Sequence, residues 1–133
     1  MATLPLYILL CSADRDKLQM GSMIASVAAV SERPVHVFVS MGAIKAFDKK
    51  LTGAARYTEG PFTKELTDKN APDPVDLFGQ GKMLGDEMTM YACSMVLDVL
   101  GWEMDDLTED LFDGAMGLTK FLSDAESGQL ISL

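Results

Sequence analysis

The sequence predicts a three-layer α/β domain, in which a mostly parallel five-stranded sheet carries helices on both faces. Short runs of apolar and β-branched residues alternate along the chain with longer segments whose apolar residues recur at helical spacing. The short runs are apolar throughout, which is typical of parallel strands covered on both faces. The length of 133 residues suits one domain, so we expect residues 1–133 to share a single core.

The first three predicted elements form one βαβ unit. Leu4–Leu10 is a continuous apolar run, and Val35–Val39 is a second run, rich in β-branched residues. Between them we expect an amphipathic helix over Lys17–Ser31, whose apolar stripe consists of Met20, Met23, Ile24, Val27 and Val30. This order predicts two parallel strands joined by a crossover helix.

The segment after the second strand is predicted to be largely irregular. Ser40 can cap a short helix whose apolar positions are Ile44, Phe47 and Leu51. From Thr52 to Pro72 the helical periodicity disappears. A loop of about 20 residues in a compact domain is more often a lid, a binding arm or a subunit contact than a simple connection.

The alternation of elements resumes after this loop. Asp73 as the N-cap and Pro74 at the first helical position begin a helix that ends by Gly85. The third strand is expected over Glu87–Ala92. A helix from Cys93 to Leu100 follows it directly, with Val96, Val99 and Leu100 facing inward and Gly101 as its stop.

The last part of the chain is expected to complete the sheet. Residues 102–112 read as a short helical turn, and Ala115 and Met116 as a brief strand. The last helix has an apolar stripe made of Leu118, Phe121, Leu122 and Ala125. Residues 129–133, with the sequence QLISL, form the final strand.

Composition narrows the choice of partners and compartments. With 20 acidic against 11 basic residues the formal net charge is −9, and no basic stripe is present, which excludes a nucleic-acid partner. A protein partner is expected to dock through a basic face, since opposite potentials speed encounter. No apolar run approaches the roughly 20 residues of a membrane span, and the N-terminal segment lacks the features of a signal peptide. We therefore expect a cytoplasmic protein with no membrane association.

Several kinds of site are excluded by the residues present. Two cysteines without a C-x-x-C motif, together with one histidine, cannot supply a four-ligand zinc site, so no metal is expected. The turn CSADRDK after the first strand has no glycine, and no G-x-G-x-x-G or P-loop motif follows any strand, which argues against nucleotide and flavin cofactors.

The remaining polar groups have structural interpretations. His36 lies early in the second strand, at the opposite end of the sheet from Cys93, so a Cys–His nucleophile pair is not expected. We expect a structural role for His36 instead. The carboxylates in EMDDLTED are interpreted as a solvated acidic face. Several of the ten methionines lie on the first helix and are expected in the core or in a subunit interface.

Cys93 is the residue whose position suggests chemistry. At the first turn of a helix, unpaired backbone N–H groups and the positive end of the helix dipole favour a thiolate, and Ser94 can add a hydroxyl donor. The alternative is packing, because cysteine is among the most buried residue types. Cys11 follows the first strand, and reactive groups gather where parallel strands end. With a strand order of 2-1-3, the sulfurs of Cys11 and Cys93 would be close.

Three stretches of the chain together resemble one known family. The DsrE/DsrF-like family of sulfur-relay proteins is matched, in chain order, by the opening strand and helix LLCSADRDKLQMGSMIASVAAV, the junction YACSMVLDVLG and the closing helix and strand GLTKFLSDAESGQLISL. The resemblance covers most of the chain. Thr52–Pro72 is the segment that does not align.

The resemblance implies a flavodoxin-like sheet and a homo-oligomer, often a trimer or a hexamer. It also implies a sulfur carrier or sulfurtransferase in which Cys93 carries a persulfide. Such proteins exchange sulfur with rhodaneses and with small TusA-like carriers, in sulfur oxidation or in tRNA thiolation. A relay of this kind needs no metal, flavin or general base, so no cofactor is expected. Because a carrier is loaded and unloaded once per encounter, it is as much a substrate as an enzyme.

Three hypotheses remain open at this stage. The first is the sulfur relay, in which Cys93 is the reacting thiolate. The second is a non-catalytic interaction subunit, in which Cys93 only packs and the acidic surface or the Thr52–Pro72 loop docks a partner. The third is a thiol redox protein in which Cys11 and Cys93 form a disulfide. Cys11 is otherwise a buried small residue or a resolving thiol that attacks a Cys93 persulfide.

Overall fold

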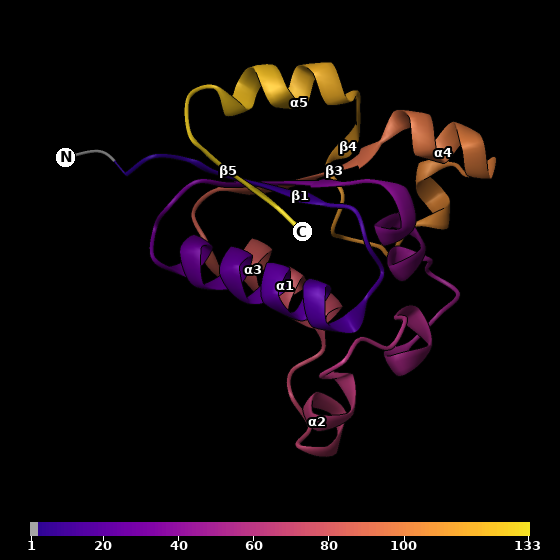
Figure 1. Cartoon of the computed structure of the whole chain (residues 1–133). Helices are drawn as coiled ribbons and strands as arrows, with labels where there is room; N and C mark the ends of the chain where they lie inside the picture. The colour runs from indigo at the N-terminus through magenta and orange to yellow at the C-terminus, as the bar shows by residue number, and fades with distance from the viewer. Residues whose placement is uncertain (1–2) are drawn as a thin grey trace.

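A five-stranded sheet lies between two layers of helices in the computed structural model, which describes residues 3–133 (Figure 1). Across the sheet the strands are β4 (Gly114–Met116), β3 (Met88–Cys93), β2 (Val35–Val39), β1 (Leu6–Leu10) and β5 (Gln129–Ser132). All four pairings between them are parallel. The predicted fold class is confirmed, and the architecture is consistent with a flavodoxin-like domain.

The helices cover the two faces unequally. One face carries the long helices α1 (Arg15–Val30) and α3 (Pro74–Leu84), and the other carries the short helix α5 (Leu118–Ala125) (Figure 1). The helix α4 (Ser94–Leu100) lies at the end of the sheet, and α2 (Thr63–Asp68) lies apart from the sheet (Figure 1). The connections also contain the 3-10 helices η1 (Met41–Phe47), η2 (Gly53–Arg56) and η3 (Met104–Asp106).

The core has two halves, one on each face of the sheet, because successive side chains of a strand point to opposite faces. The fully buried residues Ile8, Val37 and Met90 belong to the half under α1 and α3, and Phe78 of α3 packs there against Phe47. On the other face, Phe121 of α5 stacks on Phe38, with ring centroids 5.0 Å apart, and meets the edge of Tyr7 at 5.5 Å. One phenylalanine thus anchors α5 to the sheet.

The helix predicted over Lys17–Ser31 is confirmed as α1, but of the predicted apolar stripe only Ile24 packs against the core. The side chains of Met20, Met23, Val27 and Val30 are exposed, and the buried positions are Arg15, Leu18, Gln19, Gly21, Ser22, Ala25 and Ala29. Small residues line this face because α3 approaches closely. A Cβ placed on Gly85, at the end of α3, would lie 2.7 Å from the Cβ of Ala29.

The predicted irregular loop Thr52–Pro72 contains the helices η2 and α2. Polar contacts hold it to the start of α1. The hydroxyl of Thr63 donates to Asp16 at 2.8 Å, and the backbone N–H of Phe62 donates to the same carboxylate at 2.8 Å. Tyr57 donates to Asp73, the N-cap of α3, at 2.9 Å. The segment is therefore a polar clamp across the ends of two helices, and the expectation of an unstructured loop is wrong.

The remaining predicted elements are present with small changes. Asp73 caps α3 by accepting from the N–H groups of Val75 and Asp76, as expected. Ser40 stands at the N-cap of η1, but its side chain makes no capping hydrogen bond. The short turn, the brief strand, the last helix and the final strand are confirmed as η3, β4, α5 and β5.

The predicted inner faces of the last two helices are only partly right. In α4, Val99 is exposed and Leu97 is buried in its place. In α5, Phe121 and Ala125 are buried, whereas Leu118 and Leu122 are largely exposed. A helix of two turns buries few side chains, so one-residue errors in its orientation reverse the prediction for individual positions.

Candidate functional site

Cys93 lies at the junction between a strand and a helix, one residue from where the sequence placed it. It is the last residue of β3 and the N-cap of α4, with φ −64° and ψ 117°. In the sheet register it pairs with Met116 of β4. Its residue surface is only 4% exposed, and it packs with the buried core. A reagent or partner can reach its sulfur only by displacing the side chains around it.

Ser94, the residue expected to support a Cys93 thiolate, is the first residue of α4 and is exposed. Within residues 3–133, the side-chain hydrogen bonds include none between Ser94 and Cys93. The predicted support of a Cys93 thiolate by the Ser94 hydroxyl is therefore absent from this conformation. The positions of Ser94 and Cys93 in the chain are otherwise as expected.

Cys11 and Cys93 lie at the same height in the sheet but not side by side. The register pairs Leu10 with Val39 and Val39 with Ala92. The residues that follow these, Cys11, Ser40 and Cys93, therefore lie in one row across the carboxyl ends of β1, β2 and β3. Because β2 lies between β1 and β3, the 2-1-3 order is wrong. Two strand spacings of about 4.8 Å separate the cysteines by about 10 Å, which exceeds the Cα separation of about 7 Å that a disulfide tolerates.

The strand order also places Cys11 where such sheets often bind ligands. The chain runs from β1 through β2 and β3 to β4 in one direction, and β5 then pairs with the other side of β1. The reversal therefore falls between β1 and β5, and Cys11 follows β1 there, its N–H donating to the Leu133 carbonyl at 2.8 Å. Ligands of open α/β sheets gather at such reversals, whereas Cys93 lies two strands away.

His36 lies far from both cysteines. It pairs with Thr89 near the start of β3, four residues before Cys93, which corresponds to about 13 Å along a strand. Its Nδ1 lies 2.7 Å from the Thr89 hydroxyl and its Nε2 3.4 Å from the Glu87 carboxylate. Burial lowers the pKa of His36, and Glu87 and Asp124 oppose that shift. The geometry is that of a histidine fixed by its neighbours on the sheet.

A shallow apolar groove lies beside the Cys93 junction and was not anticipated from the sequence. It has a volume of about 290 Å³ and is formed by η1 and α4, with the lining residues Met41, Gly42, Lys45, Met95, Val96, Val99 and Leu100. Met41, Met95 and Val99 are each more than half exposed. Met41 and Met95, apolar residues shortly after two strand ends, were the available signal, whereas Val99 was predicted to face inward.

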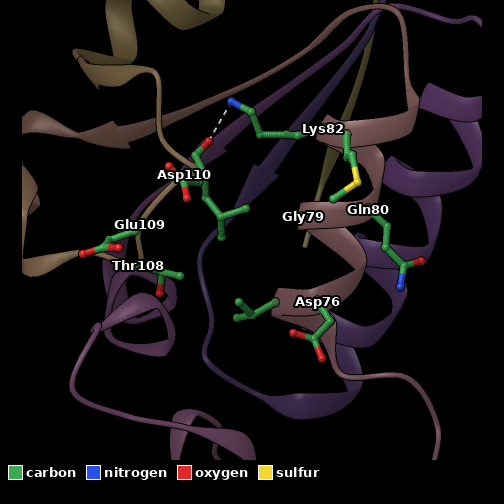
Figure 2. A pocket seen from close by; sticks show the side chains of 10 residues that line it. Asp76, Gly79, Gln80, Lys82, Thr108, Glu109 and Asp110 are labelled. Carbon is green, nitrogen blue, oxygen red and sulfur yellow. Dashed lines mark hydrogen bonds between the residues drawn. The ribbon is translucent and has the colours of Figure 1, made fainter.

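A larger cavity lies elsewhere, between α3 and the segment before β4 (Figure 2). It holds about 640 Å³ and is lined by Val75, Asp76, Gly79, Gln80, Lys82, Met83, Thr108, Glu109, Asp110 and Leu111. Lys82 closes one side by donating to the Leu111 carbonyl at 2.8 Å (Figure 2). The free carboxylates at its rim leave it net acidic, and none of the predicted site residues lines it.

A smaller cavity of about 300 Å³ lies under the polar clamp and is lined in part by Arg15 and Tyr57. The Arg15 guanidinium is buried, donates to Gln19 at 3.0 Å and lies 5.3 Å from the centre of the Tyr57 ring. Burial raises the pKa of Tyr57. These groups hold one another in place. The Tyr57 hydroxyl also donates a hydrogen bond to the Asp73 carboxylate.

The described residues form neither a metal-binding cluster nor a membrane-spanning helix. Among residues 3–133, no three His, Cys, Asp or Glu side chains converge on a point where they could hold a metal ion. Within the same described range, no helix combines the length and hydropathy needed to cross a bilayer.

Comparison with known proteins identifies a similar fold. No family model and no curated protein matches the chain. A solved structure of a protein of unknown function, MTH1491 from Methanobacterium thermoautotrophicum, superposes with a TM-score of 0.60 and 15% sequence identity. The match covers 98% of this chain and 99% of that one. At this identity the similarity shows a shared fold over the whole length.

Proposed function

We propose that the protein is a cytoplasmic sulfur carrier of the DsrE/DsrF-like type, which accepts sulfane sulfur as a persulfide on Cys93 and passes it to a partner thiol. The single observation that supports this is the placement of Cys93 at the carboxyl end of β3 and the N-cap of α4, in the context YACSMVLDVLG. Rhodaneses and TusA-like carriers are the expected exchange partners.

The chemistry requires one thiolate and no cofactor. The Cys93 thiolate attacks the outer sulfur of a donor persulfide R–S–SH. A new S–S bond forms to Cys93, the S–S bond of the donor breaks, and the donor leaves as the thiolate R–S⁻. The reverse reaction with an acceptor thiolate unloads the sulfur. The number of S–S bonds is unchanged, so no oxidant or reductant is consumed.

Intact-mass analysis after incubation with inorganic polysulfide tests this proposal. The wild-type protein and the Cys11→Ala variant should each gain the mass of sulfur, and reductant should remove it. The Cys93→Ala variant should gain none. Equal loading of the Cys93→Ala variant, or no loading of the wild type, would contradict the proposal.

A second candidate is the non-catalytic interaction subunit, and the low exposure of Cys93 favours it, since a packed thiol needs no chemistry. Titration of the native protein with a bulky aromatic disulfide separates the two candidates. A carrier should expose Cys93 on the time scale of transfer, and its thiol should react before the protein unfolds. A packed thiol should react only at the rate of global unfolding.

We further propose that the carrier is a homo-oligomer that associates through the outer face of α1. This ridge consists of the exposed side chains of Met20, Met23, Val27 and Val30. From Met20 to Val30 the chain has no charged residue, so copies with a net charge of −9 meet least repulsion there. Sedimentation should show an oligomer that the Val27→Glu variant converts to monomer. A wild-type monomer would contradict the proposal.

A further inference from the structure

The groove between η1 and α4 has features that burial of the core does not require. Val99 is 77% exposed and Met95 is 55% exposed, although both belong to the two-turn helix α4 that Cys93 caps. The inner positions Val96 and Leu97 already attach that helix to the core. The outward apolar side chains therefore add little to its packing and are available for contact with another molecule.

Met41 forms the opposite wall of the groove and holds an unusual backbone conformation. It is the first residue after the Ser40 position that ends β2, its φ is 48°, and half of its side-chain surface faces solvent. A non-glycine residue in the left-handed region costs of order 1 kcal/mol or more, and such positions cluster at functional sites. The strained backbone presents a flexible thioether to the surface, a type of side chain that adapts to different partners.

The charge at the groove differs from that of the chain as a whole. Lys45 is the only charged residue that lines it, and no carboxylate does so. In residues 3–133, Lys64, Lys82 and Lys120 each form an ion pair, and Lys45 forms none. The exposed Asp98 of α4 does not line the groove. A protein with a net charge of −9 thus presents an apolar surface with a free cation beside its reactive junction.

From these observations we infer that the groove of Met41, Lys45, Met95 and Val99 is the docking surface for the protein that exchanges sulfur with Cys93. Its occupant is a partner segment with an apolar side chain next to its reactive cysteine and a carboxylate close by. The apolar side chain fills the groove, and the carboxylate pairs with Lys45. Only one part of this inference, that the cargo is sulfur, rests on the proposed function. The inference differs from the expectation that a partner would dock through a basic face, which stays a separate prediction.

Docking here would also explain how a buried sulfur can react. Cys93 is the N-cap of the helix whose outer side forms one wall of the groove, so a partner seated on Met95 and Val99 contacts the helix that begins directly after the cysteine. Binding energy from the apolar contact is then available to shift that helix. A small persulfide without the apolar and acidic groups has no such contact and should react slowly.

Short synthetic peptides bearing a cysteine persulfide test the inference. In one peptide the cysteine is followed by leucine and two glutamates, and in the other by leucine and two lysines. Transfer to Cys93, followed by intact mass, should be several-fold faster from the acidic peptide, because the two peptides share the leucine and differ only in the charge that faces Lys45. The Val99→Asp variant should lose this rate, and the Lys45→Glu variant should favour the lysine peptide.

The control variant is Met83→Asp, whose parent side chain on α3 is 79% exposed, close to the 77% of Val99. It should transfer sulfur at the wild-type rate. Loading of the Val99→Asp variant by inorganic polysulfide should also be unchanged. If polysulfide loads Cys93 but both peptides react at one rate in all variants, the docking surface is wrong and the proposed function stands.

If polysulfide fails to load the wild type, both the proposed function and the assignment of sulfur as the cargo are wrong. Whether the groove is a docking surface is then tested by adding the thiol form of the acidic peptide and following the backbone amide resonances of η1 and α4. Shifts in these elements that are absent in the Val99→Asp variant support the docking surface, and their absence in the wild type overturns it.

Discussion

Lys82 and Asp113 form an ion pair, with 2.6 Å between Nζ and Oδ2, that ties α3 to the segment preceding β4. The same carboxylate accepts a hydrogen bond from the backbone N–H of Met90 at 2.8 Å. The Lys82 side chain is only 18% exposed, so its charge is largely shielded from water. One aspartate thus joins a helix, a central strand and the connection to the edge strand.

The Asp113→Ala variant should lose about 2 kcal/mol of unfolding free energy, because the largely shielded Lys82 ammonium loses its counter-ion and the Met90 N–H loses its acceptor. Urea denaturation measures this loss. The control is Glu109→Ala, an exposed carboxylate in the same segment, which should stay within about 0.5 kcal/mol of the wild type. Equal effects of the two changes would mean that the ion pair contributes nothing.

Two glycines of the α3 region should respond in opposite directions to alanine. A Cβ on Gly85 would lie 2.7 Å from both the Ala29 Cβ and the Gly81 carbonyl oxygen, so Gly85→Ala should cost about 2 kcal/mol. On Gly79 the nearest atom would be 3.8 Å away, so Gly79→Ala should stabilise the helix by up to about 1 kcal/mol. Thermal unfolding of both variants checks the signs, and destabilisation by both would contradict the packing described here.

The stability should depend on pH through His36, the only histidine. Burial holds its pKa in the folded protein below the value of about 6.5 that it has in an unfolded chain. Between these two values the unfolded state binds more protons, so stability is full above about pH 6.5 and falls as the pH drops through the folded pKa. The His36→Gln variant should flatten urea-unfolding profiles in this range. An unchanged profile would assign the slope to other groups.

The arrangement of the strands predicts the fate of the two thiols under oxidation. Because β2 separates Cys11 from Cys93, mild peroxide should give no intramolecular disulfide in the native protein. Peptide mapping under non-reducing conditions detects the cross-linked pair. The same treatment in concentrated urea, where the strands no longer hold the cysteines apart, should produce it. A native cross-link would contradict the strand order.

The sequence predicted the elements well because each one carries its own local signal. The N-cap Asp73 before Pro74 and the stop at Gly101, which adopts φ 69°, are local patterns that need no knowledge of neighbours. The Cys93 junction was placed within one residue for the same reason. What failed were properties that depend on distant segments.

The face of α1 illustrates that limit. Apolar residues such as Met20 and Val27 lie outside, because α3 comes so close to the other side of α1 that small residues such as Ala29 are needed where the helices meet. Hydrophobic periodicity cannot separate a stripe that packs in the core from one that is free for another molecule. The groove beside Met95 and Val99 was overlooked for the same reason, since apolar positions of α4 were assumed to point inward.

The pairing of β1 with β5 has a consequence for the way the chain matures. Leu6 pairs with Gln129 and Leu9 with Ser132, so one side of an early strand is completed by residues synthesised more than a hundred positions later. On the ribosome, that side of β1 stays an open edge until residues 129–132 have emerged, and an open edge is a template for pairing with other nascent chains. Chaperone protection of the N-terminal half during translation would therefore matter more for this protein than its modest size suggests.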